Sequence, residues 1–218
     1  MVMQVEIWSD VVCPWCLIGK HRFDTALTQF RDSHPEAPPV TVAYRAYQLD
    51  PRAPAGSTTS AMEGYARKFG GPEAAQRIVD HLTGVATADG LELRLDRARR
   101  ANTLLAHRVL WMAEHDPSAD QAHLAQLLMN GYFVQGDDVG DPDLVARLAG
   151  EAGLDAAEVR RRLDGDDGRA EVAEQLQRAS ELGITGVPTF VFNGQWMVPG
   201  AQDVDTFLRV LERVSSRS

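Results

Sequence analysis

Cys13-Pro14-Trp15-Cys16 holds the only two cysteines in this chain of 218 residues, with two residues between them. Residues 4–8, just before this stretch, alternate between polar and apolar side chains and predict a short strand. Residues 23–30, just after it, carry apolar side chains at helical spacing and predict a helix. The two thiols are therefore expected at the junction between a strand and a helix.

A pair of thiols at a helix start favours thiol–disulfide chemistry. The unpaired N–H groups and the dipole of a helix N-terminus favour a thiolate over a thiol. Pro14 suits the first helical position, where no backbone N–H is needed. We expect Cys13 to be the exposed nucleophile. Cys16, one turn later and facing inward, is expected to be the resolving thiol that releases the substrate from a mixed disulfide.

A metal site is the main alternative for a Cys-x-x-Cys pair. Structural zinc needs four protein ligands, and the chain has no further cysteine and no histidine pair at ligand spacing. A catalytic zinc held by both cysteines and one histidine is not excluded by count alone. An inert structural disulfide is disfavoured, since a four-residue loop restrains the unfolded chain little. We predict no metal and a redox-active cysteine pair.

A second signal lies near the C-terminus. Residues 189–192 are rich in β-forming side chains, and Asn193-Gly194 is a strong hairpin turn. Residues 196–198 are expected to return as the partner strand, followed by a helix that Asp203 opens. Pro188 stands at the mouth of the first hairpin strand, where a proline is tolerated.

These features together resemble the thioredoxin superfamily, and within it the DsbA group and its FrnE-like proteins. The matching stretches span nearly the whole chain: SDVVCPWC (9–16), YRAYQLDP (44–51), NTLLAHR (102–108), NGYF (130–133) and GITGVP (183–188).

The resemblance implies an α/β fold, namely a thioredoxin-like fold with a large inserted helical domain. The expected boundaries are 1–52 for the first thioredoxin-like part, 53–167 for the insert and 168–218 for the second part. It also implies a cis Val187–Pro188 bond next to the active-site disulfide. Val187, Pro188 and Trp15 are then expected to contact substrate, although Trp15 is equally well read as a partly exposed packing residue.

Composition narrows the function classes. The formal net charge is −9 and there is no basic block, which argues against nucleic-acid binding. No apolar stretch approaches the roughly 20 residues needed to span a bilayer, so no membrane partner is expected. The first residues lack a secretory pattern, which predicts a cytoplasmic protein whose disulfides are transient. The sequence does not specify an oligomeric state.

Helical patterns fill the middle of the chain, at 61–69, 72–87, 102–115, 119–134, 142–152 and 156–163, and one more follows at 169–182. The pairs Ser118 with Gln121 and Asp155 with Glu158, and Asp141 before Pro142, predict helix starts.

Several further residues of the sequence have expected positions or roles. Asn102 is expected to cap its helix, and His107 to pack between the two parts of the fold. Tyr132 and Phe133 are candidates for a groove above Cys13, with core packing as the alternative. Lys20 and His21 are expected on a solvated helix face.

Three functions compete. The first is a dithiol–disulfide oxidoreductase or isomerase acting on protein or small-molecule thiols and disulfides, without a cofactor beyond its redox-active disulfide. The second is a glutathione-dependent enzyme related to 2-hydroxychromene-2-carboxylate isomerase. That group typically carries serine at the first motif position, so Cys13 favours the first function, with glutathione kept as a candidate co-substrate. The third is a chaperone-like binding protein.

Overall fold

The computed structural model describes residues 2–217 and contains a four-stranded sheet with the order β2-β1-β3-β4. Its strands are β1 (Met3–Ser9), β2 (Val40–Ala46), β3 (Thr189–Phe192) and β4 (Trp196–Pro199). β2 runs parallel to β1, whereas β3 is antiparallel to both β1 and β4. The parallel pair requires a crossover, which α1 (Pro14–Ser33) supplies.

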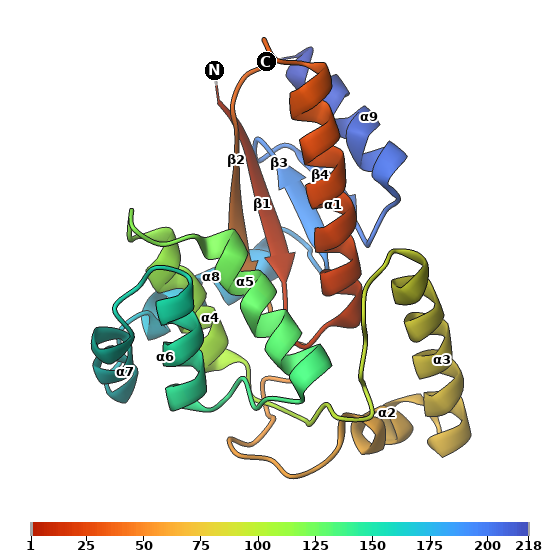
Figure 1. The fold of residues 1–218 in the computed structure, drawn as a ribbon, viewed down its shortest axis with the longest axis vertical. Coiled ribbons are helices and arrows are strands. Elements are labelled where there is room, and N and C mark those ends of the chain that lie inside the picture. The colour runs from red at the N-terminus through yellow and green to blue at the C-terminus, as the bar shows by residue number, and fades with distance from the viewer. Residues whose placement is uncertain (1, 218) are drawn as a thin grey trace.

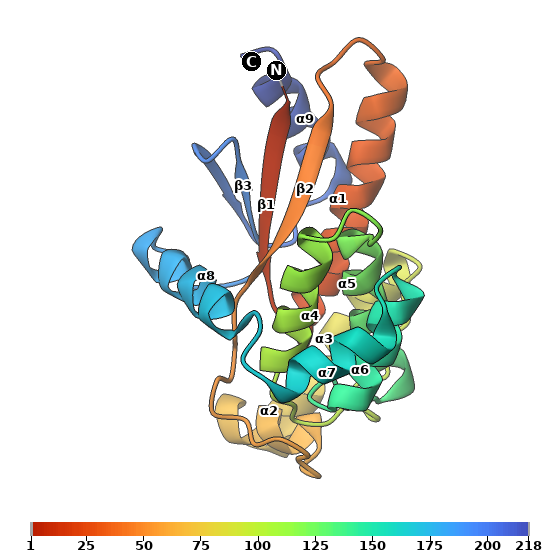
Figure 2. The ribbon, with the colours of Figure 1, turned by 90° about the vertical axis from the view of Figure 1, so that its left-hand side faces the viewer.

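Helices cover both faces of this sheet (Figures 1 and 2). α1 and α9 (Val204–Ser215) lie together on one face, where Phe23, Phe190 and Phe207 form a ring cluster. α8 (Arg169–Glu181) lies on the other face, where Ala179 packs near the fully buried Trp8. The end of β1 at Ile7–Ser9 is therefore buried on both faces, which fixes the strand just before the cysteine pair.

The β3–β4 hairpin turns at Asn193-Gly194, as the sequence predicts. Both residues have positive φ angles, 50° and 66°, which asparagine and glycine tolerate best. Strand pairing resumes at Trp196, as expected, so Gln195 is a third loop residue after the Asn193-Gly194 turn.

A helical segment joins β2 to α8. Its α-helices are α2 (Ala61–Phe69), α3 (Pro72–Ala88), α4 (Leu104–Glu114), α5 (Gln121–Asn130), α6 (Pro142–Glu151) and α7 (Ala156–Asp164). The helices predicted in this region are confirmed to within two residues, except for the one at 119–134. In the structure this stretch divides into α5 and a π-helical turn at Gly131–Gln135. The sequence predicted a single helix because the apolar spacing continues through the change of helix type.

The helix starts are mostly as predicted. The side chains of Asp141 and Asp155 accept hydrogen bonds from the backbone at the starts of α6 and α7. The predicted cap at Ser118 is wrong. Asp120 caps α5 instead, accepting from the backbone N–H of His123, while the Ser118 hydroxyl donates to Asp116.

Two glutamine side chains close the open edge of β2. Gln121 of α5 accepts from the backbone N–H of Tyr44 at 2.8 Å and donates to its carbonyl at 3.1 Å. Gln175 of α8 accepts from the N–H of Ala46 at 2.8 Å. These bonds satisfy an edge that would otherwise pair with another strand, and they fasten the helices to the sheet.

Within residues 2–217, no helix combines the length and the apolar character needed to cross a membrane.

Candidate active site

Cys13 is the residue that opens α1. Its backbone is extended, with φ −91° and ψ 114°, and Pro14 occupies the first helical turn as predicted. The Cys13 carbonyl accepts the first intrahelical bond, from the N–H of Cys16 at 2.9 Å. The Cys13 N–H donates to the Asp10 carbonyl at 3.0 Å. The first sulfur thus lies at the N-terminus of α1, as the motif predicts.

The hairpin brings a proline loop against this helix start. Trp8 pairs with Thr189, so the residues just before β3 reach the loop after β1. The Val187–Pro188 peptide bond is cis. The Cys13 thiol donates to the Val187 carbonyl at 3.6 Å, which joins residues that are far apart in the sequence.

Two further bonds hold the proline loop in place. The Thr189 hydroxyl donates to the Gly186 carbonyl at 2.8 Å, and the Gly200 N–H donates to the Pro188 carbonyl at 2.7 Å. The Val187 carbonyl therefore faces Cys13 from a loop that is fastened on both sides.

The prediction that Cys13 is exposed is wrong, because only 4% of this residue is accessible. The Val187 carbonyl covers it from the sheet side. Burial, and then the electrostatic interaction with Cys13, raise the pKa of Tyr65 on α2. Trp15 is half-buried, with its ring 6.1 Å from that of His81 on α3. Cys13 thus belongs to the apolar core, with Trp15 packed against it, which the motif itself does not reveal.

Cys16 faces inward, as predicted, and is 1% exposed. Burial raises the pKa of its thiol, and interactions with Cys13 raise it further. Both cysteines are free thiols in this structure.

Other sequence candidates fare differently. Asn102 accepts from the N–H of Leu104 at 3.0 Å and so supports the start of α4, although the N-cap residue is Thr103 and not Asn102 as predicted. His107 is confirmed as a buried residue between the helical segment and the sheet. Lys20 is buried beside Asp24, which corrects the prediction of a solvated face. Tyr132 and Phe133 are 5% and 0% exposed, so they belong to the core, and the predicted groove lined by them is wrong.

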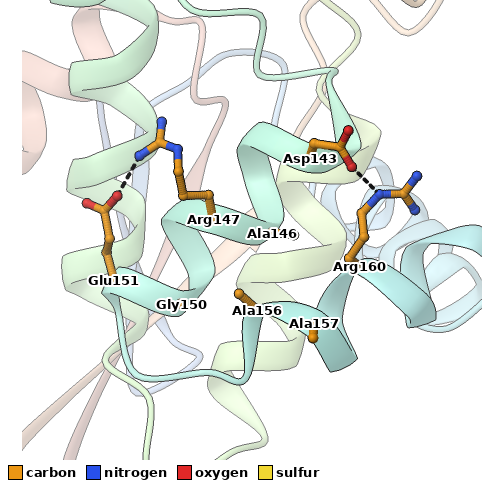
Figure 3. A pocket seen from close by; sticks show the side chains of 8 residues that line it. All are labelled: Asp143, Ala146, Arg147, Gly150, Glu151, Ala156, Ala157 and Arg160. Atoms are coloured by element: carbon orange, nitrogen blue, oxygen red, sulfur yellow. Dashed lines mark hydrogen bonds and ion pairs between the residues drawn. The ribbon is translucent and has the colours of Figure 1, made fainter.

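Two hollows adjoin the segment that leads into the proline loop. One, of about 450 Å³, is lined by residues 183–189 together with Met197, Pro199 and Gly200. The other lies between residues 47–51 and α8, and it shares Ile184 and Thr185 with the first. A larger hollow of about 560 Å³ lies elsewhere, between α6 and α7. Its alanine-rich floor is bordered by the ion pairs Asp143–Arg160 and Arg147–Glu151 (Figure 3).

No group of three or more histidine, cysteine or acidic side chains suited to a metal ion occurs within residues 2–217.

Gly19 of α1 allows the proline loop to approach the helix. A Cβ atom at this position would lie 2.8 Å from Cγ of Pro188 and 3.3 Å from Cβ of Ala201. We predict that Gly19→Ala destabilises the fold by about 1–3 kcal/mol, because the overpacked helix and loop must move apart. Gly84→Ala in α3 is the matched control, since its added methyl meets open space and should stabilise by roughly 0.5–1 kcal/mol. Urea unfolding measures both, and equal effects would contradict the close approach.

Comparisons with known proteins agree with this geometry. The family described as DSBA-like thioredoxin domain matches residues 4–212. The structure of a probable DsbA oxidoreductase from Streptomyces coelicolor is 34% identical, with a TM-score of 0.85, covering 99% of this chain and 91% of its own. An uncharacterized protein of Bacillus subtilis, YwbO, is 24% identical over 97% of this chain and 96% of its own.

A more distant structure has the same fold. The cytosolic disulfide reductase DsbM from Pseudomonas aeruginosa, solved with glutathione, is 18% identical with a TM-score of 0.66, covering 96% of this chain and 98% of its own. The family match and the Streptomyces structure span almost all of the present sequence, and the thioredoxin-like fold expected from the motifs is confirmed. The chain belongs to the DsbA-like thioredoxin family.

Proposed function

We propose that this protein is a dithiol–disulfide oxidoreductase that uses Cys13 and Cys16 through a mixed-disulfide intermediate. One observation carries the proposal: the Cys13 sulfur lies at the N-terminus of α1 and 3.6 Å from the carbonyl of Val187, with Cys16 buried one turn behind it. Cys13 attacks a substrate disulfide, and Cys16 then attacks Cys13 to release the substrate thiol.

The substrate contacts fall on the proline loop. An extended thiol substrate that reaches Cys13 passes the backbone of Val187, where it can pair as an added strand. Pro188 shapes that loop, and the hollow beside it supplies space for flanking groups. We assign Trp15 to the same rim, on the side of α3. No metal or cofactor enters this scheme.

Burial of Cys13 favours a small or flexible thiol partner. A folded protein surface must displace surrounding core residues before it reaches a sulfur that is 4% exposed. Glutathione is therefore the partner we propose, and the likeness to the glutathione-bound cytosolic reductase supports this choice and a cytoplasmic setting. The Ser9–Cys16 stretch further supports placement in the FrnE-like subgroup.

Competing disulfides test this proposal. The reduced protein should react with oxidised glutathione faster than with the disulfides of insulin, by about tenfold or more. Association is slower when the protein must first rearrange to admit a large partner. Stopped-flow measurement of thiol loss gives both rates, with Cys13→Ser as the blank. Equal rates would contradict the preference for a small partner, and no reaction with either disulfide would contradict the proposed function.

A further inference from the structure

The hollow between α6 and α7 has no part in the scheme above (Figure 3). Its floor consists of small residues, namely Ala146 and Gly150 of α6 and Ala156 and Ala157 of α7. Packing between the two helices explains part of this floor, because a Cβ atom on Gly150 would lie 3.0 Å from Cβ of Ala156. Ala157 is exposed, so it belongs to the open surface and not to that packing. The hollow is therefore a depression with an apolar floor that a second surface can fill.

Four charged side chains surround this floor as two ion pairs. Arg147 pairs with Glu151 on α6, and Arg160 of α7 pairs with Asp143. Arg160 also pairs with Asp164, which lies outside the lining of the hollow. The rim thus carries two positive and two negative charges, whereas the whole chain has a net charge of −9. Two copies of so acidic a chain repel each other, and a neutral face is where they approach at the least cost.

A small charged ligand fits this rim poorly. Each arginine of the rim is already paired with a carboxylate, so a small anion competes with the rim carboxylates and a small cation with the rim arginines. A surface that carries both signs in the complementary order avoids this competition, since each rim charge then gains a second partner without losing its first. The charges therefore favour an occupant that is itself a protein surface with paired arginines and carboxylates.

The arrangement of the rim charges is complementary to itself. In the view of Figure 3, the Arg147–Glu151 pair lies on one side of the hollow and the Asp143–Arg160 pair on the other. The charged ends of Arg147 and Asp143 lie above those of their partners in this view. A two-fold axis that runs from top to bottom between the two pairs, in the plane of an interface, exchanges the two sides. Arg147 of one copy then meets Asp143 of the other copy. Glu151 likewise meets Arg160, so every contact joins opposite charges, as a two-fold interface requires.

The order of charges along α6 leads to the same pairing. Asp143 and Arg147 are one turn apart on the same face of this helix. The two-fold axis crosses α6 near Ala146 (Figure 3), so the helix and its copy run antiparallel. The acidic start of each helix then lies against the basic turn of the other. Ala146 and Gly150 allow a close approach of the two helices, because the distance between packed helices depends on the side chains at the contact.

We propose that α6 and α7 form the interface of a homodimer, in which this face of one copy docks on the same face of a second copy. The alanine floors meet at the centre, and the rim charges pair across the interface. α5 lies between α6 and α1 (Figure 1), so both Cys13 sites remain outside the interface. The face is small, and we expect a dissociation constant at the weak end of the range for protein interfaces, roughly micromolar. At submicromolar concentrations the chain is then monomeric.

Sedimentation velocity of the whole chain over a concentration series tests the dimer. The wild type should change from monomer to dimer as the concentration passes through the roughly micromolar range. Arg147→Glu places a carboxylate against Asp143 of the other copy, and Asp143→Arg places two guanidinium groups together. Symmetry repeats each like-charge contact, so we expect either variant to raise the dissociation constant by about tenfold or more.

An equimolar mixture of these two variants gives the sharpest result. In a mixed dimer the new carboxylate of Arg147→Glu faces the new guanidinium of Asp143→Arg. At the second contact the unchanged Asp143 faces the unchanged Arg147. We therefore expect the mixture to dimerise at a concentration at which each variant alone is monomeric. A loss of folding or a change of net charge within one chain does not produce such a recovery.

Two further variants complete the test. Arg209→Glu makes the same change of net charge on exposed α9, away from α6 and α7 (Figure 1), and should leave the dissociation constant unchanged. Ala157→Arg fills the hollow from an exposed position and should prevent dimerisation even if a charge variant fails to fold.

Four results would overturn the proposal. A monomer at every concentration would leave this face to a different partner. A dimer that persists in Ala157→Arg would have its interface elsewhere. A mixture that fails to recover would show that Arg147 and Asp143 do not meet. Equal weakening by Arg209→Glu and Arg147→Glu would show that only the net charge matters.

Discussion

Cys16→Ser is expected to trap a stable mixed disulfide on Cys13, whereas Cys13→Ser is expected to form none. Cys13 lies at the helix N-terminus beside the Val187 carbonyl, where an incoming disulfide meets it first. Cys16 is 1% exposed behind it and is reached only from Cys13. Without Cys13 the exchange rate should therefore fall by about a thousandfold or more, a loss of the size seen when an enzyme loses its nucleophile.

Intact-mass analysis after incubation with oxidised glutathione measures both outcomes. The two variants are matched controls, since each retains one thiol and changes one sulfur to oxygen. Equal adduct formation on Cys16 in Cys13→Ser would contradict the assigned roles. The binding-protein alternative predicts a different result: Cys13→Ser would still suppress the aggregation of an unfolded client as well as the wild type does.

Arg108→Met is expected to destabilise the protein by about 3–5 kcal/mol, because several buried carbonyls lose their donor together. The Arg108 side chain is fully buried. Its guanidinium donates to four backbone carbonyls at the end of α7 and in the loop that follows, namely those of Arg162, Leu163, Gly165 and Asp167. It also places a positive charge at a helix C-terminus.

Urea unfolding of Arg108→Met beside Arg147→Met tests this role. Arg147 pairs with Glu151 one turn away on the surface of α6, with 58% of its side chain exposed. A pair so exposed contributes at most about 0.5 kcal/mol, so Arg147→Met should be nearly neutral. Arg108→Lys, with fewer donors in a different geometry, should lie between them. Equal losses in Arg108→Met and Arg147→Met would contradict the account of Arg108.

Local signals in the sequence predicted much of the fold. The strand before Cys13, the helix start at Pro14 and the Asn193-Gly194 turn each depend on residues within a few positions of one another. Apolar periodicity located the helices for the same reason. Local signals also misled at 119–134, where Asp120 and not Ser118 caps the helix and the π-helical turn ends it.

The site depends on contacts that the sequence does not display. Cys13 is buried in a core that α1 shares with residues far along the chain, and Asp10 meets His107 only when α4 packs against the sheet. Lys20 and Arg108 look like surface residues because of their charge. The structure buries them beside Asp24 and the carbonyls after α7. Periodicity records which residues share a face of one helix, and it holds no information about which element packs against that face.

The central claim is tested most directly by equilibrating the protein with mixtures of reduced and oxidised glutathione. The samples are then quenched in acid and analysed by intact mass. We expect a single reversible transition in which the protein loses two hydrogen atoms and both Cys13 and Cys16 become unreactive to alkylation, because they form one disulfide. The same treatment should give only the glutathione adduct in Cys16→Ser. Two free thiols at every ratio, or a wild-type adduct that never resolves, would contradict a redox-active Cys13–Cys16 pair.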